Sequence, residues 1–194
     1  MAVENILVGY AKIWYAPLGT AFPDETTIGY GVSWPSWTYL GDTTEPLTLE
    51  VDRNVFDVEI QQSNIPVKQS ITKQTISLKT TLAEHTVTNL QLAFLGTASS
   101  TASGSGQKPY SQLAFGGETN PDYYAFGFEA LYQTATNINE PVRYLFWKGS
   151  LTLDGNIAFD KGAAAGIPIS ITILADTSKP VGIQTGYVQQ VTGS

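Results

Sequence analysis

The segment EPLTLEVDRNVFDVEI, residues 45–60, decides the fold of this chain, because its apolar positions change parity within one strand-like run. The first half carries them at odd positions (Leu47, Leu49 and Val51) and the second half at even positions (Phe56, Val58 and Ile60). Successive side chains of a strand point to opposite faces. A change of parity therefore indicates a bulge, a turn, or a strand that passes between two buried environments.

The next segment, IPVKQSITKQTISLKTTL at residues 65–82, makes the same change. Its apolar positions shift from Ile65, Val67 and Ile71 to Ile76, Leu78 and Leu82. Two neighbouring segments with the same change favour an extended hairpin whose base packs on the domain core and whose far end meets another surface, such as a second subunit. Two shorter strands on each side, joined by ordinary turns, remain the alternative.

A helix is predicted directly after this hairpin, in TTLAEHTVTNLQLAFLG. Thr86 is a suitable N-cap, Val87, Leu90 and Phe94 repeat at helical spacing, and Gly96 ends the run. The following run, TASSTASGSGQ, is rich in serine, threonine and glycine. It predicts a flexible loop over about residues 97–108.

Period-two alternation predicts strands in the rest of the chain. IPISITIL places its isoleucines on one face, at 167, 169, 171 and 173. YYAFGFEALYQ carries an aromatic face of Tyr124, Phe126, Phe128 and Tyr132, opposite Gly127 and Glu129. VRYLFWKGSLTLDGN places Leu145, Trp147, Leu151 and Leu153 on one face, and residues 137–141 are expected to link these last two strands as an antiparallel pair. AKIWYAPLGT predicts a further strand that Pro17 and Gly19 end, so the chain is expected to be mainly β.

The composition restricts the class of protein. With 194 residues, the chain is expected to form a single domain over 1–194, with a C-terminal tail from about residue 180. The absence of cysteine excludes disulfides, thiolate metal sites and a cysteine nucleophile. MAVENILVGYAK has no basic flank before its apolar run, and no run approaches the ~18 apolar residues of a membrane span. We therefore expect synthesis in the cytoplasm and no membrane insertion.

Catalysis has little support in the sequence. His85 is the only histidine, and no GxSxG motif or phosphate-binding GxxxxGK[ST] loop accompanies it. Asp52, Asp57 and Glu59 alternate with apolar residues as the solvent face of a strand does, so they are interpreted as surface residues. We expect no enzyme, no cofactor and no metal site. A hydrolase that uses two carboxylates remains the alternative.

Two further features bear on binding. Trp34 and Trp37, in VSWPSWTYL, suit either a stacking platform in a carbohydrate- or receptor-binding module or the closure of one end of the core. The net charge of −7, from 17 acidic and 10 basic side chains, argues against a surface that grips nucleic acid by neutralising phosphates.

The order of these features resembles the major tail tube proteins of long-tailed (siphovirus-like) bacteriophages. An N-terminal strand ending in YAPLGTAFPDE precedes W-x-x-L-G at residues 37–41, then T-x-E-P-L-T-L-E, the long hairpin and the helix. FDKGAAAGIPISITILADTSKPVG, at residues 159–182, is similar to the lysine-glycine turn, strand and ending of that family. The resemblance extends from about residue 11 to residue 182.

This resemblance implies a β sandwich or partial barrel with one short helix. It implies a non-enzymatic virion structural protein, made in the host cytoplasm, whose homo-hexameric rings stack into the tail tube that delivers the genome. Its partners would be tape measure, tail terminator and distal tail proteins, and DNA would pass through the lumen without specific binding. The family's geometry would place the candidate contact residues, in the hairpin loop, at or near the contact between rings: Asp52, Arg53, Asn54, Asp57 and Glu59. The alternative for them is a solvated loop.

Overall fold

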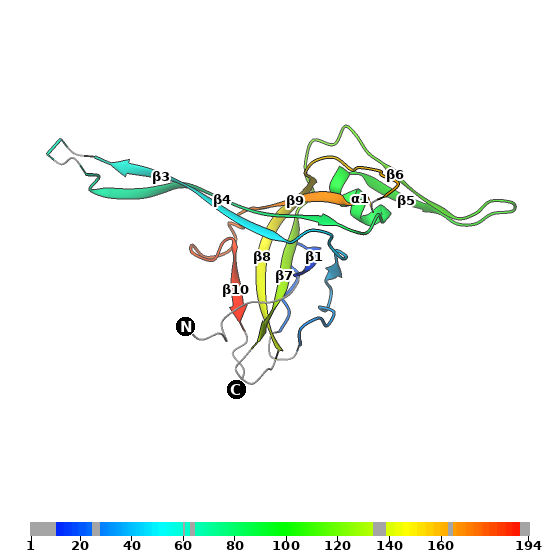
Figure 1. Ribbon diagram of the computed structural model, residues 1–194, viewed down its shortest axis with the longest axis horizontal. Helices are drawn as coiled ribbons and strands as arrows, with labels where there is room; N and C mark the ends of the chain where they lie inside the picture. The colour runs from blue at the N-terminus through cyan, green and yellow to red at the C-terminus, as the bar shows by residue number, and fades with distance from the viewer. Residues whose placement is uncertain are drawn as a thin grey trace.

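The computed structural model describes residues 11–24, 28–59, 61–62, 65–133, 139–162 and 165–190. Within these ranges the chain forms an antiparallel eight-stranded sheet, a separate two-stranded sheet and one helix (Figure 1). The elements in chain order are β1 (Lys12–Pro17), β2 (Thr38–Tyr39), β3 (Thr48–Val58), β4 (Lys68–Leu82), α1 (Val87–Phe94), β5 (Thr97–Thr101), β6 (Tyr110–Ala114), β7 (Tyr124–Gln133), β8 (Asn139–Leu153), β9 (Ile167–Ile173) and β10 (Gly186–Gln190).

The large sheet is curved, and its β3–β4 hairpin projects from it (Figure 1). Its strand order is β2-β1-β7-β8-β9-β4-β3, and β10 pairs with β8 beside this path. In Figure 1, β3 and β4 project to one side, α1 with β5 and β6 lies at the opposite side, and β1, β7, β10 and much of β8 run transverse to this long axis. This arrangement confirms the predicted fold class, a mainly β sandwich or partial barrel with one short helix.

Two hydrophobic clusters occupy opposite faces of the sheet. Side chains from β1, β4, β7, β8 and β9 form the larger cluster, which Leu92 and Ala93 of α1 join. Its members on β9 are the four isoleucines that period-two alternation predicts. The smaller cluster consists of Trp14, Ala16, Trp34, Trp37, Ala125 and Leu145. β1 and β7 therefore bury both faces, which is why alternation identifies only half of their buried side chains.

A bulge in β8 divides that strand between the two clusters. Phe126 lies opposite Phe146, but Tyr124, two residues back along β7, lies opposite Gly149, so β8 contains one extra residue between positions 146 and 149. The prediction that Leu145 and Trp147 share a face with Leu151 and Leu153 is therefore wrong. Leu145 belongs to the smaller cluster, where Trp147 stacks on Phe22, whereas Leu151 and Leu153 pack in the larger cluster.

The extended hairpin of β3 and β4, with its base on the sheet, confirms that part of the first interpretation of residues 45–82, while a contact of its far end with another surface stays a prediction. Asn54 lies opposite Lys73, and Val55 lies opposite Ile71, so Thr72 is the extra residue of a bulge in β4. The Thr72 hydroxyl donates a hydrogen bond to the Asn54 carbonyl at 3.2 Å. The bulge explains the parity change in β4. In β3 the side chains of Phe56 and Val58 lie on the other face of the strand, and Ile60 lies outside the described residues.

Other sequence predictions hold in part. The predicted helix is confirmed as α1, whose N-cap Thr86 accepts a hydrogen bond from the Asn89 N–H at 3.1 Å, although Leu95 rather than Gly96 takes the left-handed C-cap conformation. The predicted loop at 97–108 begins with strand β5, and the mobility of its remainder stays a prediction. Pro141, expected in the link between two strands, lies inside β8 opposite Leu131. The expected C-terminal tail contains β10.

Candidate assembly surface

The far end of the β3–β4 hairpin extends beyond the rest of the sheet. β9 pairs with β4 only from Ile76 to Leu82, so residues 52–58 of β3 and 68–75 of β4 form a two-stranded ribbon, here called the arm. In the described part of the chain, neither outer edge of the arm pairs with another strand. A two-stranded ribbon is only marginally stable in water without packing against another element. The arm is therefore a candidate contact surface.

One face of the hairpin carries aliphatic side chains from the core to the tip. Cross-strand partners share a face, and Leu49 opposite Leu78 and Val51 opposite Ile76 begin this row beside the larger cluster. Val55 opposite Ile71 continues the row on the arm. The exposed members of this aliphatic face are between 40% and 56% exposed: Leu49, Val51, Val55, Val67 and Ile71. Among the described residues, the apolar surface of the larger cluster thus continues onto the arm, where its side chains are exposed to solvent.

A cleft lies where the aliphatic face meets the body of the domain. Its volume is about 570 Å³, and Leu47, Leu49, Phe128 and Tyr144 are among its lining residues. Glu45 is the one carboxylate in the lining, and a two-carboxylate hydrolase needs a pair. In the described ranges no group of three or more His, Asp or Glu side chains is placed to hold a metal ion. The apolar part of its lining continues the aliphatic face as far as Phe128 and Tyr144.

The opposite face of the hairpin is mainly polar. Thr48 opposite Lys79, Glu50 opposite Ser77, Asp52 opposite Thr75 and Asn54 opposite Lys73 form its rows. The rows continue across β9 and β8 with hydroxyls: Ser77 pairs with Thr172, and Thr172 pairs with Ser150. Near the tip, Phe56 places an exposed ring on this face.

The structure places four of the five predicted contact residues on a paired strand rather than in a loop. Asp52, Arg53, Asn54 and Asp57 all lie within β3 opposite β4, and Glu59 follows the strand; all five are exposed. The expected position in a hairpin loop is therefore wrong for the four residues of β3, because the ladder continues to Val58 opposite Lys68. The register divides them: Arg53 and Asp57 interrupt the aliphatic face, whereas Asp52 and Asn54 lie on the polar face.

A second exposed surface, which includes none of the predicted site residues, lies around α1. Phe115, 65% exposed, lies against Phe94 at the end of α1 with ring centroids 5.0 Å apart. Phe159, 83% exposed, lies near His85 at the start of α1 with centroids 6.0 Å apart. We call these rings, together with the exposed Tyr110 of β6, the aromatic end. Phe115 precedes two glycines, and Phe159 precedes the sequence Asp-Lys-Gly. A phenylalanine next to turn-forming residues is the sequence signal that could have indicated exposed rings here.

The two tryptophans of the possible binding platform are buried. Trp34 stacks on Trp14 with centroids 5.5 Å apart, and Trp37 packs edge-on against Trp34 at 5.3 Å. The interpretation that they close part of the core is confirmed, because both belong to the smaller cluster.

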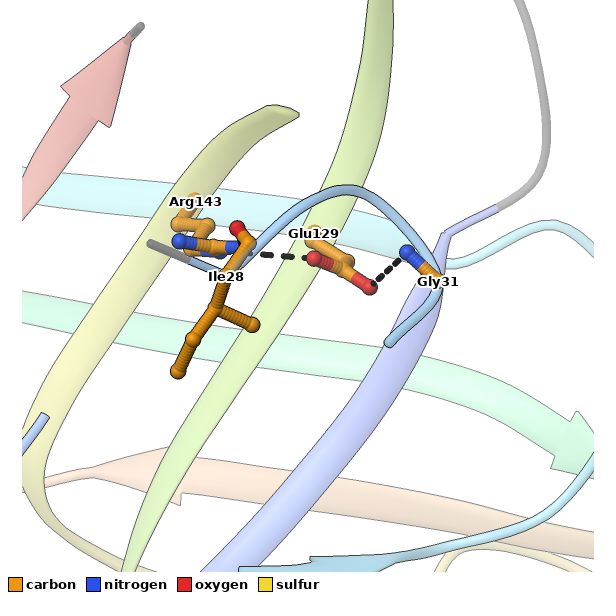
Figure 2. A network of polar contacts seen from close by, with 4 residues as sticks. All are labelled: Ile28, Gly31, Glu129 and Arg143. Atoms are coloured by element: carbon orange, nitrogen blue, oxygen red, sulfur yellow. Dashed lines mark hydrogen bonds and ion pairs between the residues drawn. The ribbon is translucent and has the colours of Figure 1, made fainter. Parts of the chain in front are cut away.

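A buried ion pair attaches the loop that carries Trp34 to the sheet (Figure 2). Arg143 Nε lies 3.3 Å from Glu129 Oε2, and both side chains are fully buried. Glu129 accepts a hydrogen bond from the Gly31 N–H at 2.9 Å, and Arg143 donates one to the Ile28 carbonyl. The guanidinium also lies 5.5 Å from the centroid of the Trp34 ring. The ion pair and its hydrogen bonds fix residues 28–34 over β7 and β8. The alternation in the sequence predicted only that Glu129 lies on the face of its strand opposite the aromatic residues, and it did not indicate a partner for Glu129.

Comparison with known proteins gives one family match. The family model described as phage tail tube protein matches residues 2–182, nearly the whole chain. A search of curated proteins gave no match. In the described residues no helix has the length and apolar character needed to cross a membrane. The described ranges combine a curved sheet, an uncovered arm and buried tryptophans. The family match covers nearly the whole chain, so the chain belongs to the phage tail tube protein family, whose members are structural components of the phage tail.

Proposed function

We propose that this chain, folded as a single domain, assembles into hexameric rings that stack into the tail tube of a long-tailed, siphovirus-like phage, through which the genome is delivered. The observation that carries the proposal is the arm, a paired ribbon whose aliphatic face continues the core surface into solvent. An exposed apolar face and free strand edges are liabilities in a monomer, and a closed assembly of copies removes them.

The candidate contact residues suit a role between rings. Asp52, Arg53, Asn54, Asp57 and Glu59 follow one another along the arm, where a neighbouring copy would meet both faces. Charged side chains at a rim mainly set orientation and partner choice, while apolar contacts supply the affinity. In this proposal Arg53 and Asp57 fix the register of the arm on its neighbour, and the aliphatic side chains around them supply most of the buried area.

The polar face of β4, β9 and β8 suits the wall of a DNA passage. Its cross-strand rows contain mostly hydroxyls, as in Ser77, Thr172 and Ser150. Lys73 and Lys79 also lie on the polar face of the hairpin, Lys79 in an ion pair with Asp154. The hydroxyl side chains hold no phosphate by charge, and the net charge of −7 opposes DNA binding to the tube as a whole. We therefore place these rows in the lumen, where DNA slides without being held.

A stacked tube also requires other partners. Its two ends and its length have to be set by other tail proteins, and the tape measure, tail terminator and distal tail proteins are the proposed partners. Synthesis in the host cytoplasm would precede incorporation into the virion tail. A carbohydrate- or receptor-binding module is not favoured, since Trp34 and Trp37 are buried and form no exposed platform.

Negative-stain electron microscopy over a concentration series, beside size-exclusion chromatography, tests the proposal. Rings or hollow tubes with six-fold symmetry are the expected result. A protein that stays monomeric at every concentration, also when tail initiation proteins are added, would contradict it.

Replacement of Arg53 and Asp57 by alanine tests the arm. The double variant is expected to fold as a monomer with an unchanged circular dichroism spectrum and to form few tubes. The matched control replaces Lys79 and Asp154, an exposed ion pair at 3.2 Å off the arm, and is expected to assemble normally. Normal tubes from the arm variant would remove these residues from the contact.

A further inference from the structure

We propose that the aliphatic face of the arm of one copy docks on the aromatic end of a second copy, so that the subunits join head to tail. This inference rests on the proposed assembly and names the two surfaces that meet. The donor surface is the row of Val51, Val55 and Ile71 with its continuation at Leu49 and Val67. The acceptor surface is formed by Phe115, Phe159 and Tyr110 around α1.

The donor surface needs a partner because nothing in the described chain covers it. Its members are between 40% and 56% exposed although they share a face with fully buried Leu78. Beyond the end of β9 the arm has no third strand, and the cleft at its root keeps the aliphatic surface open as far as Phe128 and Tyr144. A partner that lies along this face would extend the larger cluster.

The acceptor surface has the matching chemistry. Phe115 and Phe159 present most of their ring area to solvent at the two ends of the eight-residue helix α1. Aromatic rings bury large apolar areas and pack well against aliphatic side chains, and exposed rings of this kind are typical anchors of protein interfaces. The neighbouring strand β5 and residues 102–106 after it contain only serine, threonine, alanine and glycine, and Lys108 is the one charged residue between β5 and β6, so little charge would have to be desolvated there.

The positions of the two surfaces rule out a contact between them within one chain, so the proposed partner is another copy. In Figure 1 the projecting part of β3 and β4 and the helix α1, beside which Phe115 and Phe159 lie, are on opposite sides of the molecule, so the two surfaces do not meet within one chain. A contact between two different surfaces of identical subunits is heterologous, and each bound copy still presents one free donor and one free acceptor. Such a contact repeats, and it either closes into a ring or extends along a tube. An isologous pairing of two arms would instead stop at a dimer.

Because the chain has no cysteine, cross-linking between single thiols tests this contact directly. One variant carries Val55→Cys on the donor face, and a second, size-tagged variant carries Ala114→Cys, which neighbours Phe115 and is exposed. The two variants are mixed, allowed to assemble, and treated with a short thiol-to-thiol cross-linker that spans a one-residue offset in register. The matched control replaces Val55→Cys by Asn54→Cys, which is the adjacent arm residue on the opposite face.

The expected product is a mixed dimer of the tagged and untagged chains with Val55→Cys, and its loss with Asn54→Cys. Equal cross-linking from both arm positions, no cross-linking from either, or a dimer linked only through two Val55→Cys chains would each overturn the proposal. Electron microscopy of the same samples separates the two levels of inference. Tubes without the mixed dimer refute this docking while the tail tube assignment stands, and the absence of both tubes and dimer counts against both.

Discussion

Replacement of Arg143 by methionine is expected to destabilise the fold strongly, because it leaves the Glu129 carboxylate buried without its cation. Both side chains are fully buried, with Nε and Oε2 3.3 Å apart, and the remaining donor to Glu129 is the Gly31 N–H. Methionine preserves much of the side-chain volume, so the change tests the charge rather than a cavity. The Ile28 carbonyl also loses its donor.

The expected magnitude follows from the burial. Removal of one partner from a buried ion pair costs about 3–5 kcal/mol, because the other charge stays in a medium that solvates it poorly. A loss near the middle of that range lowers the folding equilibrium constant by roughly a thousandfold. For a domain of this size it also lowers Tm by about 10 °C. Adding Glu129→Gln removes the stranded charge and keeps an acceptor for Gly31, so the double variant is expected to recover about 2 kcal/mol.

Urea unfolding of the monomer, followed by tryptophan fluorescence, measures both variants. The matched control is Lys79→Met, which breaks an exposed ion pair with Asp154 and is expected to change the free energy of unfolding by less than about 1 kcal/mol. If Arg143→Met costs no more than this control, or if adding Glu129→Gln makes the protein less stable still, the stranded charge is not the cause and the reasoning fails.

Three further changes test local features of the fold. Gly127→Ala should destabilise the protein by about 1–3 kcal/mol in the same urea assay, because its new Cβ would lie 2.6 Å from Cζ3 of Trp34, and wild-type stability would contradict the close packing. Thr86→Ala should cost about 1 kcal/mol by removing the N-cap of α1, whereas an unchanged unfolding midpoint would show that the cap contributes nothing. Hydrogen bonds from the Ser178 hydroxyl and N–H hold the pKa of Asp176 below its ordinary value. The ionised carboxylate therefore stabilises the fold at pH values above its unfolded-state pKa, and this stabilisation is lost as the pH falls through its folded-state pKa. Ser178→Ala should raise that pKa in an NMR titration of the carboxyl group, and an unshifted titration would remove the hydroxyl as the cause.

The features that sequence patterning predicts well are those with one buried face. β9 alternates because its isoleucines pack on the larger cluster while Ser170 and Thr172 do not join it, and α1 has a helical apolar period and a threonine cap. Patterning fails where a strand buries both faces, as in β7, since Glu129 then occupies a core position that reads as a solvent position. It also fails at the β8 bulge, because one extra residue reverses the faces of everything beyond it.

The candidate site was only partly predictable. The parity changes in residues 45–82 indicate an extended hairpin, but they do not show whether the apolar side chains of its far end are covered. The exposure of Val55 and Ile71 depends on where β9 ends, which is a property of the sheet and not of the arm itself. Phe115 and Phe159 lie near the two ends of α1, although their positions in the sequence are more than forty residues apart. No local sequence pattern relates them.

The bulge in β8 fixes the length of that strand more firmly than its composition. On one edge, β8 pairs with β10 up to Phe146 and with β9 from Gly149 onward, so the extra residue stands where the partner strand changes. An insertion or deletion of one residue there would send Leu151 and Leu153 to the wrong side of the sheet. Substitutions at Lys148 would leave this alternation intact. Evolution of this protein is therefore expected to exchange side chains between positions 146 and 149 while keeping the number of residues constant.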